Sequence, residues 1–239
     1  MTSPRILITR ADGDAAGLRQ ALEALGAQVS EVAVIGIDPP PDVEPLERAL
    51  AGNSRYDWIV FTSRNAVRAV AGRTIGGKVA AVGAGTAAEL RSLGIEPALI
   101  GQGTSADLAR DLTVHGIEGK RILIPQGNLA RPDLAETLSA AGAVVETVLA
   151  YVTVRPVVDA ASLAPLRSGE IDAVTLTSPS AYRNLRVALG DDSPLDRVAL
   201  VCIGPTTAEA VRQSGRMPAA TAEEPTVAAL ARAAVGAAK

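Results

Sequence analysis

The sequence predicts an α/β protein with two doubly wound parallel-sheet domains, one of them discontinuous, joined by a two-stranded antiparallel connector. The first observation behind this prediction is an internal repeat. Residues 5–32 align without gaps with residues 121–148, and eleven of the 28 positions are identical, where roughly two are expected by chance. The second observation is a regular alternation of strand-like and helix-like patterns, which predicts parallel sheets covered by helices on both faces.

The remainder of the chain also repeats, and this sets the domain organisation. The matching residues are Thr62 and Ser63 with Thr177 and Ser178 (shift 115), Gly83 and Thr86 with Gly204 and Thr207 (shift 121), and Thr104 with Thr226 (shift 122). One copy runs unbroken through the middle of the chain, whereas the other is assembled from both ends. The same cyclic order of elements is therefore cut at two different points.

This arrangement predicts the domain boundaries. We expect residues 1–33 and 157–239 to form the discontinuous domain and residues 42–148 to form the inserted one. Residues 34–41 and 149–156 are then the two connector strands. Because the chain passes along them in opposite directions and both are β-like, we expect them to pair antiparallel.

Local patterns justify the elements in order. An apolar strand at 6–8 precedes a helix whose apolar residues at 18, 21, 22 and 25 share one face and which stops at Gly26. The valines at 29, 32 and 34 predict one strand that ends at the prolines 39–41. Further strands are expected at 57–61, 78–82, 97–100 and from the second repeat copy to 156, and helices at 44–55, from 65, at 87–93 and at 106–112. The C-terminal third repeats the middle and is expected to alternate in the same way.

Composition excludes several classes of protein. The chain has 239 residues, 48% of them hydrophobic and 21% charged, which suits one large or two ordinary globular domains. No apolar run approaches the ~20 residues that cross a bilayer, and residues 1–12 do not resemble a signal peptide. We therefore expect a cytoplasmic protein that does not bind membranes, and a monomer. The net charge of −3 gives no basic footprint for nucleic acid.

The chain has one cysteine, Cys202, and one histidine, His115. A single cysteine excludes an intrachain disulfide. The pair is too small a set for a His/Cys metal site, and nothing near His115 indicates a Ser-His-Asp or Cys-His arrangement. We expect no bound metal.

Small polar residues and glycines follow nearly every predicted strand. The turns are 9–10, 62–65, 83–86, 103–105, 126–128, 177–180, 204–207 and 225–226. Ligands of open parallel sheets bind beyond the carboxyl ends of the strands, where such turns leave backbone N–H groups free to bind an anion. For any single turn, ordinary helix N-capping, worth about 1 kcal/mol, is the favoured explanation. Together the turns predict a cleft that holds several carboxylates or phosphates.

Known nucleotide motifs do not fit these turns. Gly83-Ala84-Gly85 lacks the third glycine of a dinucleotide fingerprint, and no P-loop lysine follows. Acidic residues such as Asp57 and Asp172 show no spacing that requires acid–base catalysis.

Tyr151 lies on the second connector strand, and its counterpart in the first repeat copy is Ile35. The repeat therefore does not require its hydroxyl. A functional interpretation is donation of a hydrogen bond or proton to a leaving group, since a free phenol is protonated at neutral pH. A packed amphipathic ring is the other interpretation. Arg10 and Arg131 lie at turns that face the predicted cleft, where either an anionic ligand or plain solvation explains them.

Seven short motifs occur in order over nearly the whole chain. They are TSRNAV (62–67), VGAGTA (82–87), PQGNLAR (125–131), Y-x-T-V-x-P (151–156), TSPSA (177–181), GPTTA (204–208) and AEEPT (222–226). Together they resemble the uroporphyrinogen-III synthase family. The resemblance implies two α/β domains joined by a two-stranded ladder, one domain being discontinuous, which agrees with the topology predicted from the repeat.

The resemblance also implies a reaction and a set of site residues. The substrate would be hydroxymethylbilane, a linear tetrapyrrole with eight carboxylates, and a cyclising carbon–oxygen lyase without a cofactor would convert it to uroporphyrinogen III in haem biosynthesis. Tyr151 would assist departure of the hydroxyl group. Candidate substrate-binding residues, from these motifs and the strand-end turns, are Arg10, Thr62, Ser63, Thr86, Gly127, Asn128, Arg131, Ser178, Ser180, Thr206 and Thr207.

In the implied mechanism, ionisation of the ring A hydroxymethyl group gives an azafulvene. The substituted carbon of ring D attacks it, and the resulting spiro intermediate fragments and recloses with ring D inverted. Because the substrate also closes unaided, without inversion, the enzyme has to hold a conformation in which the hindered carbon is the nearer nucleophile. A tenfold preference corresponds to about 1.4 kcal/mol in relative barriers.

Two other functions remain open at the level of the sequence. A two-lobed binding protein for small anions would suit facing α/β domains, but the periplasmic proteins of this type need export. A nucleotide-sugar enzyme would need a base or carboxylate poised over the donor, and the sequence offers no clear candidate.

Overall fold

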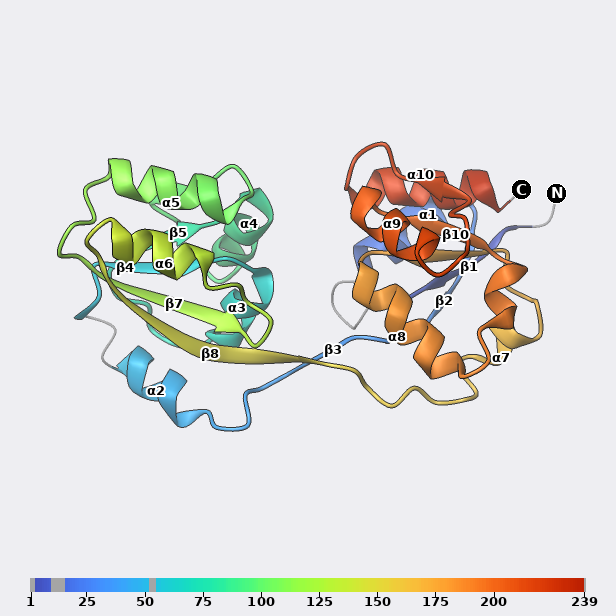
Figure 1. Ribbon diagram of the computed structural model, residues 1–239, viewed down its shortest axis with the longest axis horizontal. Coiled ribbons are helices and arrows are strands. Elements are labelled where there is room, and N and C mark those ends of the chain that lie inside the picture. Colours follow the sequence, from blue (N-terminus) through green and yellow to red (C-terminus); the bar gives the residue numbers. More distant parts are fainter. Residues whose placement is uncertain (1–2, 10–15, 52–54, 239) are drawn as a thin grey trace. The chain divides into compact units, whose positions relative to one another are not determined.

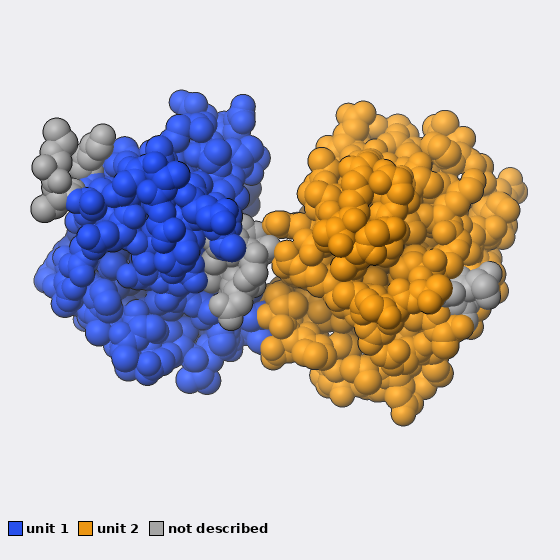
Figure 2. Space-filling view, turned by 180° about the vertical axis from the view of Figure 1, so that it is seen from behind, with its two compact units in different colours: residues 1–36, 154–239 blue, residues 37–153 orange. Residues whose placement is uncertain are grey.

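The computed structural model describes residues 3–9, 16–51 and 55–238. The chain divides into two compact units (Figure 2). Unit 1 contains Met1–Gly36 and Val154–Lys239, and unit 2 contains Ile37–Thr153. Unit 2 is thus continuous in sequence, whereas unit 1 is built from both ends of the chain.

Unit 1 is built on a sheet of five strands in the order β11-β10-β9-β1-β2. Figure 1 labels β1, β2 and β10 of this sheet. All the neighbouring pairs in this order are parallel. The strands are β1 (Arg5–Ile8), β2 (Gln28–Glu31), β9 (Ala173–Leu176), β10 (Ala199–Cys202) and β11 (Ala220–Thr221). The helices are α1 (Ala16–Ala24), α7 (Ala164–Arg167), α8 (Pro179–Leu189), α9 (Pro205–Arg212) and α10 (Val227–Ala237), with a 3-10 helix η2 (Ser193–Asp196) before β10.

Unit 2 has a sheet of six strands in the order β3-β8-β7-β4-β5-β6. The strands are β3 (Gly36–Asp38), β4 (Trp58–Phe61), β5 (Lys78–Ala81), β6 (Leu99–Ile100), β7 (Arg121–Gly127) and β8 (Val144–Val154). Pairing is parallel from β8 to β6. The helices are α2 (Glu44–Ala51), α3 (Arg64–Ala69), α4 (Ala84–Ser92), α5 (Ser105–Val114) and α6 (Asp133–Ala140).

Both sheets are buried on both faces, because successive strand residues enter different hydrophobic clusters. In β1, Leu7 packs into one cluster while Ile6 and Ile8 pack into another. In β4, Ile59 and Phe61 are separated in the same way from Trp58 and Val60. Runs of consecutive apolar residues are typical of parallel strands covered on both faces. The predicted fold class, α/β with doubly wound parallel sheets, is confirmed.

The two sheets share one strand order, as the sequence repeat requires. From one edge of the sheet to the other, the order in unit 1 is β11-β10-β9-β1-β2. The corresponding strands of unit 2 have the order β6-β5-β4-β7-β8. The chain enters unit 2 along β3 and leaves it along β8, which lies next to β3 in the sheet. An ideal Cβ on Gly36, at the start of β3, would lie 3.0 Å from Cγ2 of Val154, at the end of β8. The two strands therefore run in opposite directions.

Two local predictions differ from the structure. The single strand expected from the valines at 29, 32 and 34 is two strands, β2 and β3, in different sheets. Between them Val32 and Val34 are buried against the helical layer of unit 1, so their apolar character reflects core packing in a loop. Helix α4 begins at Ala84, three residues before the predicted start, because Gly83 already serves as its N-cap. Helix α2 is described as far as Ala51, and residues 52–54 of the predicted helix lie outside the described residues.

Candidate functional site

A pocket of about 430 Å³ lies within unit 2, at the carboxyl ends of β4 and β7 and beside β8. It is lined by Thr62, Ser63, Ser105, Ile124, Gln126, Gly127, Leu129, Ala130, Arg131, Asp133, Leu134 and Tyr151. Five of the residues expected to act on substrate are in this lining, namely Thr62, Ser63, Gly127, Arg131 and Tyr151. Their convergence follows from topology, because parallel neighbouring strands end at the same edge of a sheet.

An irregularity between β7 and β8 places Tyr151. The two strands pair in regular register up to Gln126 and Leu149, after which Gly127 pairs with Tyr151. The extra residue, Ala150, forms a β-bulge on β8, and bulges commonly re-aim a side chain near a functional site. Here the bulge is followed by a tyrosine that lines the pocket.

The Tyr151 ring lies directly against the backbone of Gly127. An ideal Cβ on this glycine would be 2.5 Å from Tyr151 Cζ and 2.8 Å from its hydroxyl oxygen. Real Cβ atoms do not approach this closely, so any side chain at 127 would displace the ring. The absence of a side chain at Gly127 therefore allows the Tyr151 ring to pack against the backbone.

The Tyr151 hydroxyl lies 3.1 Å from Ser63 Oγ. Ser63 is the N-cap of α3, and its Oγ also accepts a hydrogen bond from the backbone N–H of Ala66 at 3.1 Å. One Ser63 lone pair is thus used by the cap, and its own O–H can point to the Tyr151 oxygen. In that arrangement the phenol proton faces the pocket, ready to be donated to a bound molecule.

Asn128 is the residue after Gly127 in the chain, and it does not line the pocket. Its side-chain Oδ1 accepts a hydrogen bond from the backbone N–H of Thr153 at 2.8 Å, and its Nδ2 faces the Thr153 carbonyl at 3.5 Å. Its backbone N–H donates to the carbonyl of Tyr151 at 3.3 Å. The carboxamide therefore continues the β7–β8 ladder beyond the last strand residue.

The pocket carries both charge signs. Arg131 is exposed at the rim, and Asp133 opens helix α6. From the neighbouring helix, Ser105 joins the lining while Thr104 caps α5. The Thr104 hydroxyl, helped by Arg110, lowers the pKa of Asp107. Thr104 and Asp107 thus stabilise the helix start, and Ser105 is the hydroxyl of this turn that reaches the pocket.

The remaining candidates within the described residues do not line this pocket. Thr86 of α4 and Thr207 of α9 are both buried near a helix start, after the glycine N-caps Gly83 and Gly204. Thr206 is exposed. In unit 1, Ser178 caps α8 by accepting from the N–H of Ala181, and it is hydrogen-bonded to Ser180 at 3.0 Å. Arg10 falls outside the described residues.

Sequence reasoning missed some residues of the pocket. Leu129, Ala130, Asp133 and Leu134 line it, and none of them was a candidate. Ser105 and Gln126 had been placed in strand-end turns but not singled out. The available signal was their position, since 129–134 directly follow the β7 turn and have to pass over the strand ends to reach α6.

Among residues 3–9, 16–51 and 55–238 there is no group of three or more His, Cys, Asp or Glu side chains placed to hold a metal ion. Over the same residues no helix combines the length and the apolarity needed to span a bilayer.

Comparison with known proteins gives a consistent result. The family model described as uroporphyrinogen-III synthase HemD matches residues 16–232. The uroporphyrinogen-III synthase of Synechococcus elongatus is 29% identical over 220 residues, 84% of this chain and 83% of that protein. The chloroplastic uroporphyrinogen-III synthase of Oryza sativa subspecies japonica is 31% identical over 227 residues, 89% of this chain and 73% of that protein.

Solved structures support the fold. The crystal structure of uroporphyrinogen-III synthetase from Helicobacter pylori superposes with a TM-score of 0.65, covering 98% of this chain and 99% of that one at 15% sequence identity. A family model that matches most of the chain, a relative above 30% identity and the same α/β architecture lead to one conclusion: the chain belongs to the uroporphyrinogen-III synthase family.

Proposed function

We propose that this protein cyclises hydroxymethylbilane to uroporphyrinogen III, with loss of water and inversion of ring D. The observation that carries the proposal is the Tyr151 hydroxyl, held 3.1 Å from Ser63 Oγ in the lining of a strand-end pocket. The reaction needs one proton donor at the leaving hydroxyl and many contacts to carboxylates. A carbon–oxygen lyase with a phenol donor and turns rich in N–H groups meets both needs.

The chemical step follows from this geometry. Tyr151 donates its proton to the ring A hydroxyl as the carbon–oxygen bond breaks, so water leaves and an azafulvene forms. The hydroxyl of Ser63, donating to the Tyr151 oxygen, stabilises the negative charge that develops there. Attack by ring D, fragmentation of the spiro intermediate and reclosure then release a proton from ring D. That proton restores the phenol, and the overall loss is one water.

Selectivity has to come from the shape in which the substrate is held. About 3 kcal/mol of difference between the two closure barriers corresponds to a product ratio above a hundred. A few charge-assisted hydrogen bonds to carboxylates, each contributing roughly 1.5–3 kcal/mol, supply this amount. We assign these contacts to Arg131 and Thr62 in unit 2, with Arg10, Thr86, Ser178, Ser180, Thr206 and Thr207 as further candidates.

Other properties belong to the same proposal. We propose that the enzyme works in the cytoplasm as a monomer, without metal, cofactor or nucleic acid. The substrate activates itself, because the pyrrole nitrogen of ring A can expel the hydroxyl once that group receives a proton. The protein then needs to supply only the proton, the fold of the substrate and exclusion of the simpler closure.

The decisive experiment uses hydroxymethylbilane itself. The purified protein is incubated with it, the products are oxidised, and the type I and type III porphyrin isomers are separated by chromatography. We expect type III to dominate and its formation to outpace the uncatalysed reaction. Type I alone, formed at the rate of a protein-free sample, would remove the proposal.

The role of Tyr151 is tested by Tyr151→Phe. We expect turnover to fall by about 10²-fold, the lower end for general acid catalysis, with some type III product remaining because the substrate is still held. Tyr56→Phe is the matched control, since the Tyr56 hydroxyl donates to Glu146 at 2.7 Å in the same unit but does not line the pocket. Unchanged turnover in Tyr151→Phe would show that its hydroxyl has no part in loss of water.

A further inference from the structure

Asn128 stands at the point where β7 ends and β8 continues. Regular pairing stops at Gly127 and Tyr151, so the backbone of β8 beyond Tyr151 has no strand partner on the β7 side. The Asn128 carboxamide takes that place. It accepts from the N–H of Thr153 at 2.8 Å, while its own N–H donates to the carbonyl of Tyr151 at 3.3 Å.

These contacts bracket the tyrosine. On the β7 side, the residue before the bulge is held by the regular ladder and the segment after it by Asn128, while β3 pairs with β8 along its other edge. The ring between them rests on Gly127 and reaches Ser63. A shift in the β8 backbone would move the hydroxyl out of reach of Ser63, because the ring is rigid and the hydroxyl lies at its far end.

The same contacts argue against a direct role in substrate binding. The best acceptor on the Asn128 side chain, Oδ1, is occupied by a backbone N–H at a normal hydrogen-bond distance. The residue is also absent from the pocket lining.

We propose that Asn128 is a positioning residue, which acts through the backbone of Thr153 to hold the Tyr151 hydroxyl beside Ser63 at the pocket. This inference rests on the proposed function, and it gives Asn128 a different role from the substrate contact expected from the family motif. Misplacement of a catalytic group by about 1 Å can cost a hundredfold in rate. We therefore expect Asn128→Ala to lower kcat by about 10- to 100-fold with little change in KM.

A double-mutant cycle separates positioning from other roles. If Asn128 acts only through the Tyr151 hydroxyl, Asn128→Ala has no further effect on kcat in a Tyr151→Phe background. A full additional loss in that background would overturn the proposal, and so would a rise in KM at unchanged kcat, which marks a substrate contact. Asn128→Ser enters the same cycle, so the result does not depend on the folding of one variant.

The conservative variant is informative as well. Asn128→Asp keeps the acceptor for the Thr153 N–H and loses only the longer 3.5 Å contact. We expect its kcat to remain within about threefold of the parent value, well above that of Asn128→Ala. An Asp variant as slow as the Ala variant would contradict the proposal. Gln102→Ala, an exposed amide at the β6–α5 turn, is the matched control and should leave kcat unchanged.

A readout without substrate distinguishes the inference from the proposed function. The chain has only three tyrosines, so spectra of protein labelled with ¹³C at tyrosine Cζ contain three signals, and Tyr151→Phe identifies one of them. Asn128→Ala should shift or broaden the Tyr151 signal and leave those of Tyr56 and Tyr182 in place, since both are buried elsewhere. An unmoved Tyr151 signal overturns the positioning role. Failure of the parent protein to make the type III isomer overturns the proposed function instead.

Discussion

Gly127 shows how a single residue without a side chain sets the geometry of the pocket. Its backbone is not in the left-handed region, so conformational freedom does not explain the glycine. The reason is contact, since a Cβ would lie 2.5 Å from Tyr151 Cζ. Gly77 differs, because it combines a φ of +75° with a Cβ position 2.5 Å from the Tyr56 carbonyl. A sequence motif records both as glycine and does not separate these causes.

We predict that Gly127→Ala lowers kcat at least as much as removal of the Tyr151 hydroxyl, about 10²-fold. The added methyl group displaces the Tyr151 ring from the Gly127 backbone and moves its hydroxyl away from Ser63. Gly17→Ala is the control: nothing lies within 4 Å of a Cβ at this helical glycine, so stability should rise by about 0.4–1 kcal/mol at unchanged activity. Steady-state kinetics and thermal unfolding measure both effects. Normal activity in Gly127→Ala would mean that the ring position is unimportant.

Asp57 and Asp172 show what a repeated residue can mean. They are equivalent in the repeat, and each carboxylate accepts from the backbone N–H of the residue that begins a strand. Asp57 bonds Arg121 at 2.9 Å, and Asp172 bonds Arg5 at 2.7 Å. Hydrogen bonding by the Arg121 backbone lowers the pKa of Asp57. The repeat therefore preserved a structural contact between neighbouring strands. This role agrees with the spacing of the two aspartates in the sequence, which does not indicate acid–base catalysis.

At the scale of elements, helix capping accounts for four of the polar turns. Ser63, Thr104, Ser178 and Thr226 each accept from the backbone N–H three residues later, at the starts of α3, α5, α8 and α10. Ordinary capping is thus real at each of these turns. Only Ser63 combines the cap with a contact to Tyr151.

This difference leads to a prediction. Ser63→Ala and Thr226→Ala should both lower the free energy of unfolding by about 1 kcal/mol, the usual cost of losing such a cap. Ser63→Ala should in addition lower kcat by roughly tenfold, because the Tyr151 oxygen loses its partner, and the loss of one charge-assisted hydrogen bond amounts to about 1.5 kcal/mol or more. Chemical denaturation and kinetics on the two variants give the comparison. If Ser63→Ala and Thr226→Ala had equal kcat, Ser63 would serve only as a helix cap.

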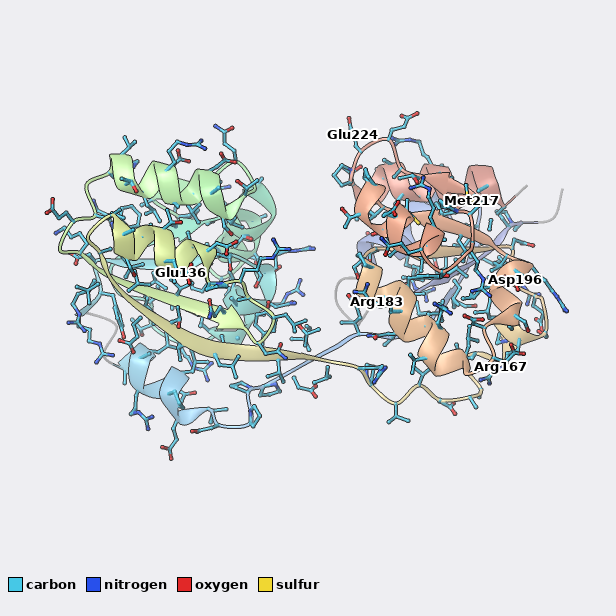
Figure 3. All side chains as sticks on the ribbon, viewed as in Figure 1. Glu136, Arg167, Arg183, Asp196, Met217 and Glu224 are labelled. Carbon is cyan, nitrogen blue, oxygen red and sulfur yellow. The ribbon has the colours of Figure 1, made fainter. Side chains whose placement is uncertain are left out.

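A charge network links the segment between α8 and β10 to the loop between α9 and β11. Arg216, with 15% of its side chain exposed, bonds Asp192 at 3.0 Å and Asp196 of η2 at 2.6 Å. Asp196 is labelled in Figure 3. Arg186 also contacts Asp192. Hydrogen bonds from Arg216 and then Arg186 lower the pKa of Asp192. A carboxyl with a lowered folded-state pKa stabilises the protein above its unfolded pKa, near 3.9, and loses that effect as pH falls through the folded value.

We predict that Asp192→Asn lowers the free energy of unfolding by about 1–3 kcal/mol at pH 7. The difference in free energy of unfolding between the parent protein and the variant should narrow as pH falls below about 4, where the parent carboxylate takes up a proton. Asp196→Asn is the control, because this carboxylate is 58% exposed and exposed pairs contribute about 1 kcal/mol or less. Urea unfolding between pH 3 and 7 measures both. A gap that does not change with pH would exclude the ionised carboxylate as its source.

For the whole molecule, the repeat was the most informative feature of the sequence. It predicted the shared cyclic order of elements and the split of one unit between the chain ends, because both can be read from the order of the repeated segments. It could not predict that the valine-rich segment 29–34 breaks between two sheets, since buried loop residues and strand residues have the same apolar character. Nor could it predict the bulge at Ala150, which depends on register.

The candidate site was predicted in part for the same reason. Strand-end turns were identified from composition, so Thr62 and Ser63 were available as candidates, and Tyr151 was a candidate from its place on the connector strand and from the family resemblance. Which of them share a pocket depends on strand order and on the position of β8 beside β7. Asn128 shows the limit of a motif, because its carboxamide is engaged by backbone rather than directed into the pocket.

We propose that the two compact units are independent folding domains. Each contains about 120 residues, enough for a stable core, and each has its own pair of hydrophobic clusters. If unit 2 were removed from the chain, the two ends left in unit 1 would already be adjacent, since Gly36 lies against Val154. A chain with residues 37–153 replaced by a short Gly-Ser linker should therefore fold, because closing so short a loop costs little entropy.

Circular dichroism and urea unfolding test this prediction on that shortened chain and on the fragment 37–153. We expect a cooperative transition for each, because every strand pair and helix within a unit is retained. The Tyr182–Ser214 hydroxyl pair, at 2.5 Å in the unit 1 core, provides a local probe. Tyr182→Phe should destabilise the shortened chain by about 0.5–1.5 kcal/mol, and the same substitution should move only one of two transitions in the full-length protein. A non-cooperative shortened chain, or one transition shifted as a whole in the full protein, would mean that the units depend on each other for stability.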